Sequence, residues 1–281
     1  MELFDKMEMI HGLRPVPSCA RLTLNGCEPT LAELAVLAQL NYGHFTTMQV
    51  RERRVRGFGL HLQRLLTATR ELFASELDVE CLRAQIRQVL DDEPASLRIT
   101  VFSLAFDRVR PELPVDADVL VTTSPARAPR SGPLRLKSMV FQRVLPHIKH
   151  IGMFGLLHLS RQARIDGFDD VVLTTVDGEI AEGSTWSIGF WDGRRVIWPS
   201  APALPGTAQQ LIQRGLREHG IACVTAPVRL DQLAGFHSAF MLNAGSVGPM
   251  IESIDAQNLH VDASVHGMLK AAWESQPMEN I

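Results

Sequence analysis

The hydrophobic positions in the first half of the chain switch between a period of two and a period near that of a helix. Four runs rich in apolar and β-branched residues predict strands at residues 20–25, 44–50, 97–104 and 119–123. An arginine-rich turn follows residue 50, and it predicts residues 54–58 as the hairpin partner of the preceding strand. Apolar residues at helical spacing predict amphipathic helices at 60–75 and 79–90, and a short helical or loop segment starts at Thr30.

A second block of strands and helices follows a proline-rich break. Residues 124–133 contain three prolines and a glycine, which neither a helix nor a central strand accommodates, so this segment is predicted as a linker. The dipeptides Asp177-Gly178 and Asp192-Gly193 lie beside β-rich runs and predict hairpin turns. The remaining pattern predicts a strand at 134–143, helices at 152–166, 206–218 and 263–273, and strands with loops at 222–256.

The order of these elements predicts an α+β protein with two domains. The chain has 281 residues, of which 46% are hydrophobic and 21% are charged, and this is enough material for two medium domains. The predicted division is a small N-terminal α/β domain at 1–123, a linker at 124–133 and a larger C-terminal domain at 134–281.

Composition and charge exclude several classes of function. The net charge is −3 and no basic patch is present, so neither nucleic-acid binding nor membrane-surface binding is expected. The sequence has no apolar run long enough to cross a membrane and no signal-peptide pattern at its start, which predicts a cytoplasmic protein. The four cysteines are far apart, form no CxxC pair, and are predicted to be reduced thiols that bind no metal: Cys19, Cys27, Cys81 and Cys223.

Lys149 is the residue on which the functional prediction depends. It lies in a mostly apolar run from Pro146 to Phe154. Burial disfavours the charged form of a lysine and lowers its pKa, and the neutral amine that results can form a Schiff base with an aldehyde. Taken alone, a lysine in such a run is more often a surface residue whose stem packs on apolar neighbours. The chain has only four lysines and otherwise uses arginine for positive charge: Lys6, Lys137, Lys149 and Lys270.

Three further segments carry candidate chemistry. Glu182 follows a predicted hairpin, and Arg64 lies on a predicted helix one turn from His61. The segment Leu204-Pro205-Gly206 turns into a predicted helix start, where free backbone N–H groups and the helix dipole favour an anion. Taken singly, these features are an exposed carboxylate, a solvated arginine and an ordinary helix cap.

The order of the four elements changes this interpretation. HLxRL at 61–65, IKH at 148–150, EGST at 182–185 and LPG at 204–206 before a helix together resemble the class IV aminotransferase family. These fold-type IV pyridoxal-phosphate enzymes include branched-chain aminotransferases, D-amino-acid aminotransferases and aminodeoxychorismate lyases. The resemblance covers about residues 22–255. It implies the two-domain fold of D-amino-acid aminotransferases, with a C-terminal pseudo-barrel.

The resemblance implies a role for each matching residue. Lys149 would hold pyridoxal 5'-phosphate as a Schiff base and would then move the proton on the substrate carbon. Glu182 would face the pyridine nitrogen, and Arg64 would bind the phosphate through its planar guanidinium. Backbone N–H groups of the helix start would also bind the phosphate, from Gly206, Thr207 and Ala208. The resemblance further implies a homodimer in which a loop of one subunit reaches the site of the other.

Two phosphate-binding segments depart from the family pattern. The usual G-I-T-R is Gly206-Thr207-Ala208-Gln209 here, so the hydroxyl has moved by one position and the arginine is missing. The asparagine of EGSxSNIF is replaced by Ser187. The second phosphate segment falls at 243–246, where Asn243 and Ala244 are expected to contact the cofactor and Asn243 or Ser246 would replace the lost hydroxyl.

The residues around the lysine leave two reactions open. Branched-chain aminotransferases usually have a tyrosine five residues after the lysine, but this chain has Phe154 there and only one tyrosine, Tyr42. Phe45-Thr46-Thr47 is closer to aminodeoxychorismate lyase, in which the Thr47 hydroxyl would relay a proton during a β-elimination that releases pyruvate. Ser103-Leu104 departs from the Arg-Gly usual at that point in the lyase, and β-branched residues are ordinary in a strand.

The first prediction is therefore an aminotransferase acting on amino acids, with the lyase as the alternative. The substrate carboxylate needs a cation, so Phe45, Arg98 and Arg108 are predicted to contact the substrate, whereas Arg110 is expected at the surface. A third hypothesis comes from a different class. The altered phosphate segments would also suit a protein that binds the cofactor weakly and acts as a binding or regulatory module.

Overall fold

The computed structural model describes residues 21–126 and 128–281. The predictions made above for residues 1–6 and for Cys19 concern residues outside these ranges. Among the described residues Cys27, Cys81 and Cys223 are free thiols. No helix in the described part of the chain is long and apolar enough to cross a membrane.

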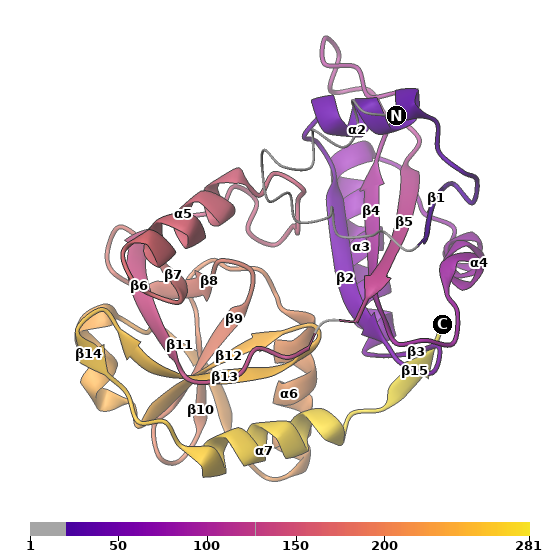
Figure 1. Cartoon of the computed structure of the whole chain (residues 1–281). Coiled ribbons are helices and arrows are strands. Elements are labelled where there is room, and N and C mark those ends of the chain that lie inside the picture. Colours follow the sequence, from indigo (N-terminus) through magenta and orange to yellow (C-terminus); the bar gives the residue numbers. More distant parts are fainter. Residues whose placement is uncertain (1–20, 127) are drawn as a thin grey trace, which may run out of the picture.

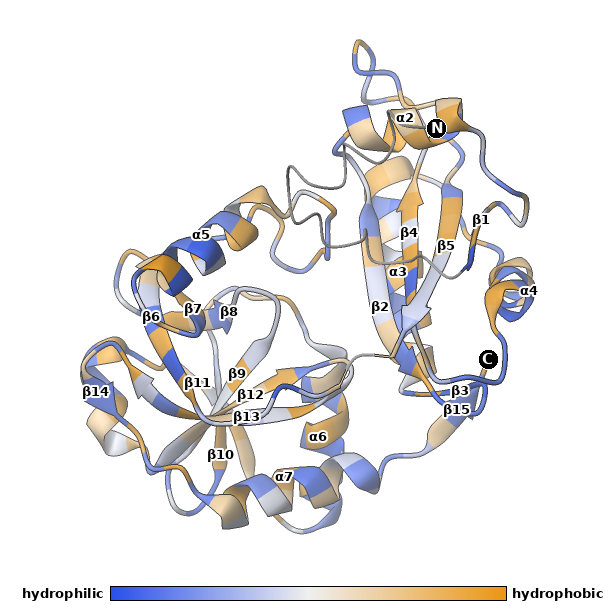
Figure 2. Ribbon diagram, in the orientation of Figure 1, coloured by the Kyte–Doolittle hydropathy of each residue, from blue (hydrophilic) through white to orange (hydrophobic). Residues whose placement is uncertain are grey.

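The first part of the chain forms a four-stranded antiparallel sheet covered by helices (Figure 1). The strands, in spatial order, are β1 (Arg21–Leu24), β5 (Asp118–Pro125), β4 (Ala95–Phe102) and β2 (His44–Val50). Their helices are α2 (Leu31–Gln39), α3 (Phe58–Phe73) and α4 (Val79–Val89). Every residue of β4 is buried except Arg98, and alternate residues from Ala95 to Val101 pack with the apolar side chains of α3 and α4 on one face of this sheet. Figure 2 shows the hydrophobic colour along α3 and β4.

The predicted hairpin after β2 is only a tight turn. Arg51 and Arg54 exchange two backbone hydrogen bonds of 3.0 and 2.9 Å, and Glu52 and Arg53 between them have positive φ angles, as in a type I′ turn. The next strand, β3 (Arg54–Arg56), is paired with β15 (Met278–Asn280) at the other end of the chain. The predicted turn and a strand after it are therefore present, but the predicted pairing of 54–58 with 44–50 is wrong beyond the bridge between Arg51 and Arg54, because a partner more than 200 residues away leaves no local pattern.

The second part of the chain forms a mixed sheet of nine strands. The strands are β6 (Leu134–Val140), β7 (Asp170–Thr174), β8 (Ile180–Gly183), β9 (Ser187–Trp191), β10 (Val196–Pro199), β11 (Cys223–Ala226), β12 (Ser238–Asn243), β13 (Ser246–Ile254) and β14 (Gln257–Asn258). The sheet curls on itself, so that its edge strand β8 also contacts β9 and β10, which lie near the opposite edge. One core fills the curl and is built from all but the shortest of these strands and the loops around them.

Three helices of the described chain pack against this sheet. α5 (Phe154–Ile165) packs on β6 and β7, and α6 (Thr207–Glu218) packs on α7 (Ala263–Glu274). A Cβ atom at Gly215 would lie 2.1 Å from the carbonyl oxygen of Ala272, so only glycine allows these two helices to approach this closely. A 3-10 helix, η1 (Leu230–Gly235), leads into β12. α7 runs beside the larger sheet and continues into β15 below the smaller sheet (Figure 1).

The smaller sheet contains residues from outside the predicted N-terminal domain. Ser124 and Pro125, which the sequence pattern assigned to the linker, are the last residues of β5. The last residue, Ile281, is buried in the core of the smaller sheet. The division into domains at residues 123 and 134 stays a prediction, and the site described next lies where the two sheets meet.

Candidate active site

A cavity with about 590 Å³ of space between protein atoms lies where the two sheets face each other. Part of this space is open to solvent. The cavity is lined by every residue predicted to be catalytic or to bind the cofactor, and by one residue predicted to bind the substrate: Phe45, Thr47, Arg64, Lys149, Glu182, Gly206, Thr207, Ala208, Asn243 and Ala244. Residues from distant parts of the sequence therefore meet at one place.

The other substrate candidates lie elsewhere. Arg98 lines a second, adjoining cavity, in which Phe45, Thr47 and Lys149 also take part, and its guanidinium carbon lies 3.6 Å from the centre of the Phe45 ring. Arg108 is exposed on the loop between β4 and β5 and lines neither cavity. Its predicted contact with the substrate has no support within one subunit.

Lys149 is held by backbone pairing with β2. The N–H of Phe45 donates to the carbonyl of Lys149 at 2.9 Å, and the N–H of Ile151 donates to the carbonyl of Gly43 at the same distance. Gly43 is needed here, because a Cβ atom would lie 2.5 Å from the carbonyl oxygen of Val101. The pairing places the Lys149 ammonium nitrogen 4.9 Å from the centre of the Phe45 ring.

The surroundings of Lys149 favour its neutral form. Burial, followed by the charges of Arg64 and Arg143, lowers the pKa of Lys149 to about 7, although Glu182 opposes the shift. A large fraction of Lys149 is therefore a free amine near neutral pH. The free amine is the form of a lysine that attacks an aldehyde.

Glu182 is buried beside an arginine that sequence reasoning missed. One carboxylate oxygen lies 3.4 Å from Nη1 of Arg143, and the other accepts a hydrogen bond of 3.3 Å from the N–H of Leu204. Arg143 is itself buried and donates through Nη2 to the carbonyl of Ile148 at 2.6 Å. Burial raises the pKa of Glu182, and Arg143 counteracts that rise. The sequence pattern placed Arg143 at the end of a strand over 134–143, but β6 ends at Val140 and Arg143 lies in the irregular segment that follows.

The opposite end of the cavity is suited to an anion. Helix α6 starts at Thr207, and its N-cap residue Gly206 provides no side chain to bond the first N–H groups. A Cβ atom at Gly206 would lie 2.4 Å from Oγ of Ser187, so glycine keeps this turn open. Arg64 adds a cation, because it donates to the carbonyl of Pro205 at 2.8 Å and its pKa, lowered to about 10 mainly by burial, still leaves it charged.

The second predicted phosphate segment is the turn between β12 and β13. Asn243 and Ala244 line the main cavity, whereas Ser246 lines the adjoining one. The side-chain oxygen of Asn243 accepts a hydrogen bond of 2.9 Å from the N–H of Gly245 and so shapes the turn.

Successive side chains along β2 point to opposite faces of the sheet. Thr47 and Phe45 line the cavity, whereas Thr46, between them, points to the other face. There its hydroxyl lies 2.6 Å from Nδ1 of His61. Burial first, and then the charges of Arg64 and Lys149, lower the pKa of His61 to about 3, so this histidine is neutral.

Phe154, which stands where branched-chain aminotransferases have a tyrosine, does not line the cavity. It is the first residue of α5, is 80% exposed, and stacks on His158. Met153, Leu156 and His150 line this part of the cavity instead.

Comparison with known proteins finds solved structures of similar fold. Solved structures of similar fold include a hypothetical aminotransferase from Mycobacterium tuberculosis in its PLP-bound form, with 21% identity and a TM-score of 0.75 over 89% of this chain and 96% of that chain. The form of that protein with alpha-ketoglutarate and PMP bound is also 21% identical, with a TM-score of 0.71 over 84% and 89%. The branched-chain amino acid aminotransferase from Escherichia coli is 18% identical, with a TM-score of 0.73 over 88% and 90%.

These likenesses show the fold, which is the fold-type IV aminotransferase fold predicted from the motifs. A comparison with curated proteins gave no match. The family model described as amino-transferase class IV matches residues 43–254, which is most of the chain and includes every residue that lines the cavity. The chain therefore belongs to the class IV aminotransferase family.

Proposed function

We propose that the cavity binds pyridoxal 5'-phosphate and that the protein transfers an amino group from an amino acid to a 2-oxo acid. The observation that carries this proposal is the arrangement of one cavity. A lysine with a pKa of about 7 lies in it together with a buried carboxylate and an open helix N-terminus beside an arginine. Those three groups match an aldehyde, a ring nitrogen and a phosphate in one ligand. The structures of similar fold that name PLP or PMP support the choice of cofactor.

When bound, the cofactor supplies an electron sink for the electrons left on the substrate Cα after its proton is removed. Lys149 would hold the cofactor covalently through Nζ and, as a neutral amine, would accept the proton of the substrate Cα. Glu182 would face the ring nitrogen, and Arg143 keeps Glu182 oriented. In the aminotransferase reaction, Lys149 would also be the group that gives this proton back.

Replacement of Arg64 tests whether this arginine binds the phosphate of the cofactor. We expect Arg64→Gln to weaken the binding of pyridoxal 5'-phosphate by about 10- to 100-fold, because a charged hydrogen bond to the phosphate is lost. Binding of pyridoxal, which lacks the phosphate, should change little. The measurement is the dissociation constant of each compound by absorbance titration. An equal loss for both compounds would mean that Arg64 shapes the cavity and does not bind the phosphate.

The β-elimination reaction remains a second candidate because of Thr47. Its hydroxyl lines the cavity together with Lys149, and in the described part of the chain no tyrosine lines this cavity. A hydroxyl in that position suits proton delivery to a leaving group attached to the substrate Cβ.

One experiment distinguishes the candidates. The cofactor-loaded protein is titrated with a panel of L- and D-amino acids while the absorption spectrum is recorded, and products are identified by mass spectrometry. For an aminotransferase we expect conversion to pyridoxamine 5'-phosphate with release of one 2-oxo acid per site. Release of pyruvate from aminodeoxychorismate without that conversion would identify the lyase. Bound cofactor with no turnover of any compound would favour the binding module.

We further propose a homodimer. Apolar side chains are exposed between the end of β6 and the first turns of α5, next to the cavity wall, where Val140 is 62%, Val144 78%, Phe154 80% and Leu157 57% exposed. A second copy that covers this surface would remove it from water. It would also place a loop near the cavity, as the family resemblance implies. Light scattering over a range of protein concentrations measures the mass directly.

A further inference from the structure

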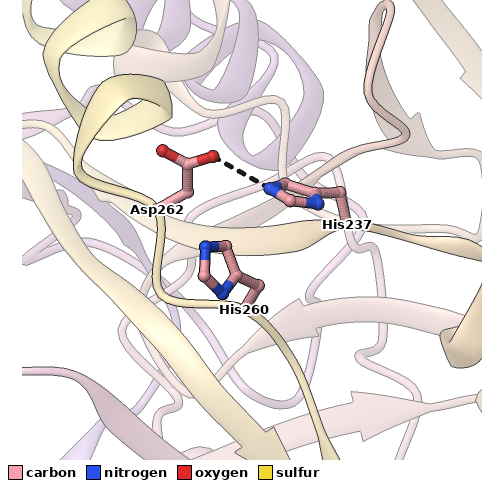
Figure 3. Close-up of side chains that lie close together, drawn as sticks. All are labelled: His237, His260 and Asp262. Atoms are coloured by element: carbon pink, nitrogen blue, oxygen red, sulfur yellow. Dashed lines mark hydrogen bonds and ion pairs between the residues drawn. The ribbon is translucent and has the colours of Figure 1, made fainter.

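Three potential metal ligands lie together on the outside of the larger sheet, away from the cavity. His237, His260 and Asp262 each offer one ligand atom, and these atoms lie within 4.8 Å of one another (Figure 3). Nε2 of His237 lies 2.9 Å from a carboxylate oxygen of Asp262, and the two imidazole rings are 4.8 Å apart between centres. Both histidines are exposed, and none of the three residues lines the candidate active site.

The backbone under this cluster is fixed by hydrogen bonds. The N–H of His260 donates to the carbonyl of His237 at 3.1 Å, and the N–H of His237 donates to the carbonyl of Trp191 in β9 at 2.8 Å. Asp262 is the N-cap residue of α7 and accepts from the N–H groups of Ser264 and Val265. His237 therefore lies just before β12, His260 lies after β14, and Asp262 lies at the start of α7. Backbone hydrogen bonds hold these segments together. A ligand that binds them has little backbone entropy to remove.

The Asp262 carboxylate has one oxygen for the helix and one for the cluster. Its Oδ1 atom accepts all the capping hydrogen bonds, and its Oδ2 atom faces His237. The oxygen that faces His237 takes no part in the helix cap, so it can bind a metal ion while the cap stays in place.

We propose that His237, His260 and Asp262 bind a divalent transition-metal ion, and that zinc is a ligand of this site. Two imidazoles and one carboxylate are donors that zinc takes with nitrogen and oxygen distances of about 2.0 to 2.2 Å, with water in the fourth position. Ligand atoms in a tetrahedral site lie about 3.4 Å apart. The widest pair here has to approach by more than 1 Å, which rotation of exposed histidine side chains allows.

The bound ion would tie the start of α7 to the strands of the larger sheet. α7 packs on α6 and leads to β15, which pairs with β3 of the smaller sheet. An ion that binds only the folded chain stabilises it by mass action. The effect of zinc is therefore expected on stability, with no contribution to the chemistry in the cavity.

The proposal is tested by zinc binding to the full chain, with any histidine tag removed and the protein treated with chelator. Zinc chloride is titrated by calorimetry, and thermal unfolding is followed with and without zinc. We expect one zinc ion per chain and a melting temperature several degrees higher with zinc. His237→Gln and His260→Gln should each weaken binding by more than about 10-fold. Asp262→Asn should also weaken binding while retaining the helix cap, since asparagine caps as well as aspartate.

The matched control is His219→Gln, which changes an exposed histidine at the end of α6 and should bind zinc like the unchanged protein. Each variant is melted without zinc to show that it folds. The proposal is overturned if the unchanged protein binds zinc no more tightly than the His237→Gln/His260→Gln double variant. Because the experiment uses neither cofactor nor substrate, its result is independent of the function proposed above.

Discussion

Lys149→Met is expected to abolish turnover, with a loss of about 10⁴-fold or more, because it removes both the covalent attachment of the cofactor and the group that moves the substrate proton. The variant should still bind pyridoxal 5'-phosphate through its phosphate, but borohydride should no longer attach the cofactor to the protein. Mass spectrometry of the reduced protein measures this. Lys270→Met, at an exposed position of α7, is the matched control and should retain both activity and attachment.

The same variant should be more stable than the unchanged protein when both lack the cofactor. The pKa of Lys149 falls from 10.5 to about 7 on folding, and each unit corresponds to about 1.4 kcal/mol. The side chain is partly exposed toward the cavity, so we discount the full value and expect a gain on the order of 2 kcal/mol at neutral pH for Lys149→Met. Urea unfolding of the cofactor-free proteins measures it.

The pH dependence of that gain has a definite sign. Because the pKa of Lys149 is lower in the folded state, the unfolded chain binds more protons between about pH 7 and pH 10.5. The stability of the unchanged protein therefore rises with pH through this window relative to Lys149→Met. The difference should be largest below pH 7 and should disappear towards pH 10.5. A difference that does not vary with pH would show that packing of the methionine is its cause.

The sequence predicted the residues of the site better than the pairing between distant segments that brings them together. The apolar run around Lys149, the carboxylate of Glu182 and the turn at Gly206 are local signals, and the structure places all three on one cavity. Their signals were an apolar run, a carboxylate just past an Asp-Gly turn and a Pro-Gly turn before a helix. That Phe45 and Thr47 share a face of β2 was not predicted, although side chains alternate along a strand.

Long-range pairing was not predictable in this way. The partner of β3 is at the far end of the chain, and the fixing of Lys149 depends on backbone bonds to β2 across more than 100 residues. Arg143 lies in an irregular segment, where no period marks a side chain as buried. Its place beside Glu182 depends on the order of strands in the sheet, because β6, which precedes Arg143, and β8, which contains Glu182, both pair with β7.

Replacement of Glu182 by glutamine is expected to lower kcat by about 10²- to 10³-fold. The amide keeps the shape of the carboxylate and its hydrogen bond from Leu204, but it carries no charge. The ring nitrogen of the cofactor then loses the partner that keeps it protonated, and the electron sink becomes weaker. Folding stability should also fall, by about 1 to 3 kcal/mol, because the buried Arg143 keeps its charge and loses its counter-charge.

A second readout separates this electrostatic role from a merely structural one. Glu182 opposes the other charges around Lys149 and raises the pKa of that lysine, so Glu182→Gln should move the pKa of Lys149 below about 7. The rate of covalent attachment of pyridoxal 5'-phosphate should then reach half its maximum at a lower pH. Glu179→Gln, three residues earlier and outside the cavity, should leave both the rate and its pH dependence unchanged. If Glu182→Gln loses activity with no movement of that pH profile, the carboxylate acts through packing of the site, and its proposed place at the ring nitrogen is wrong.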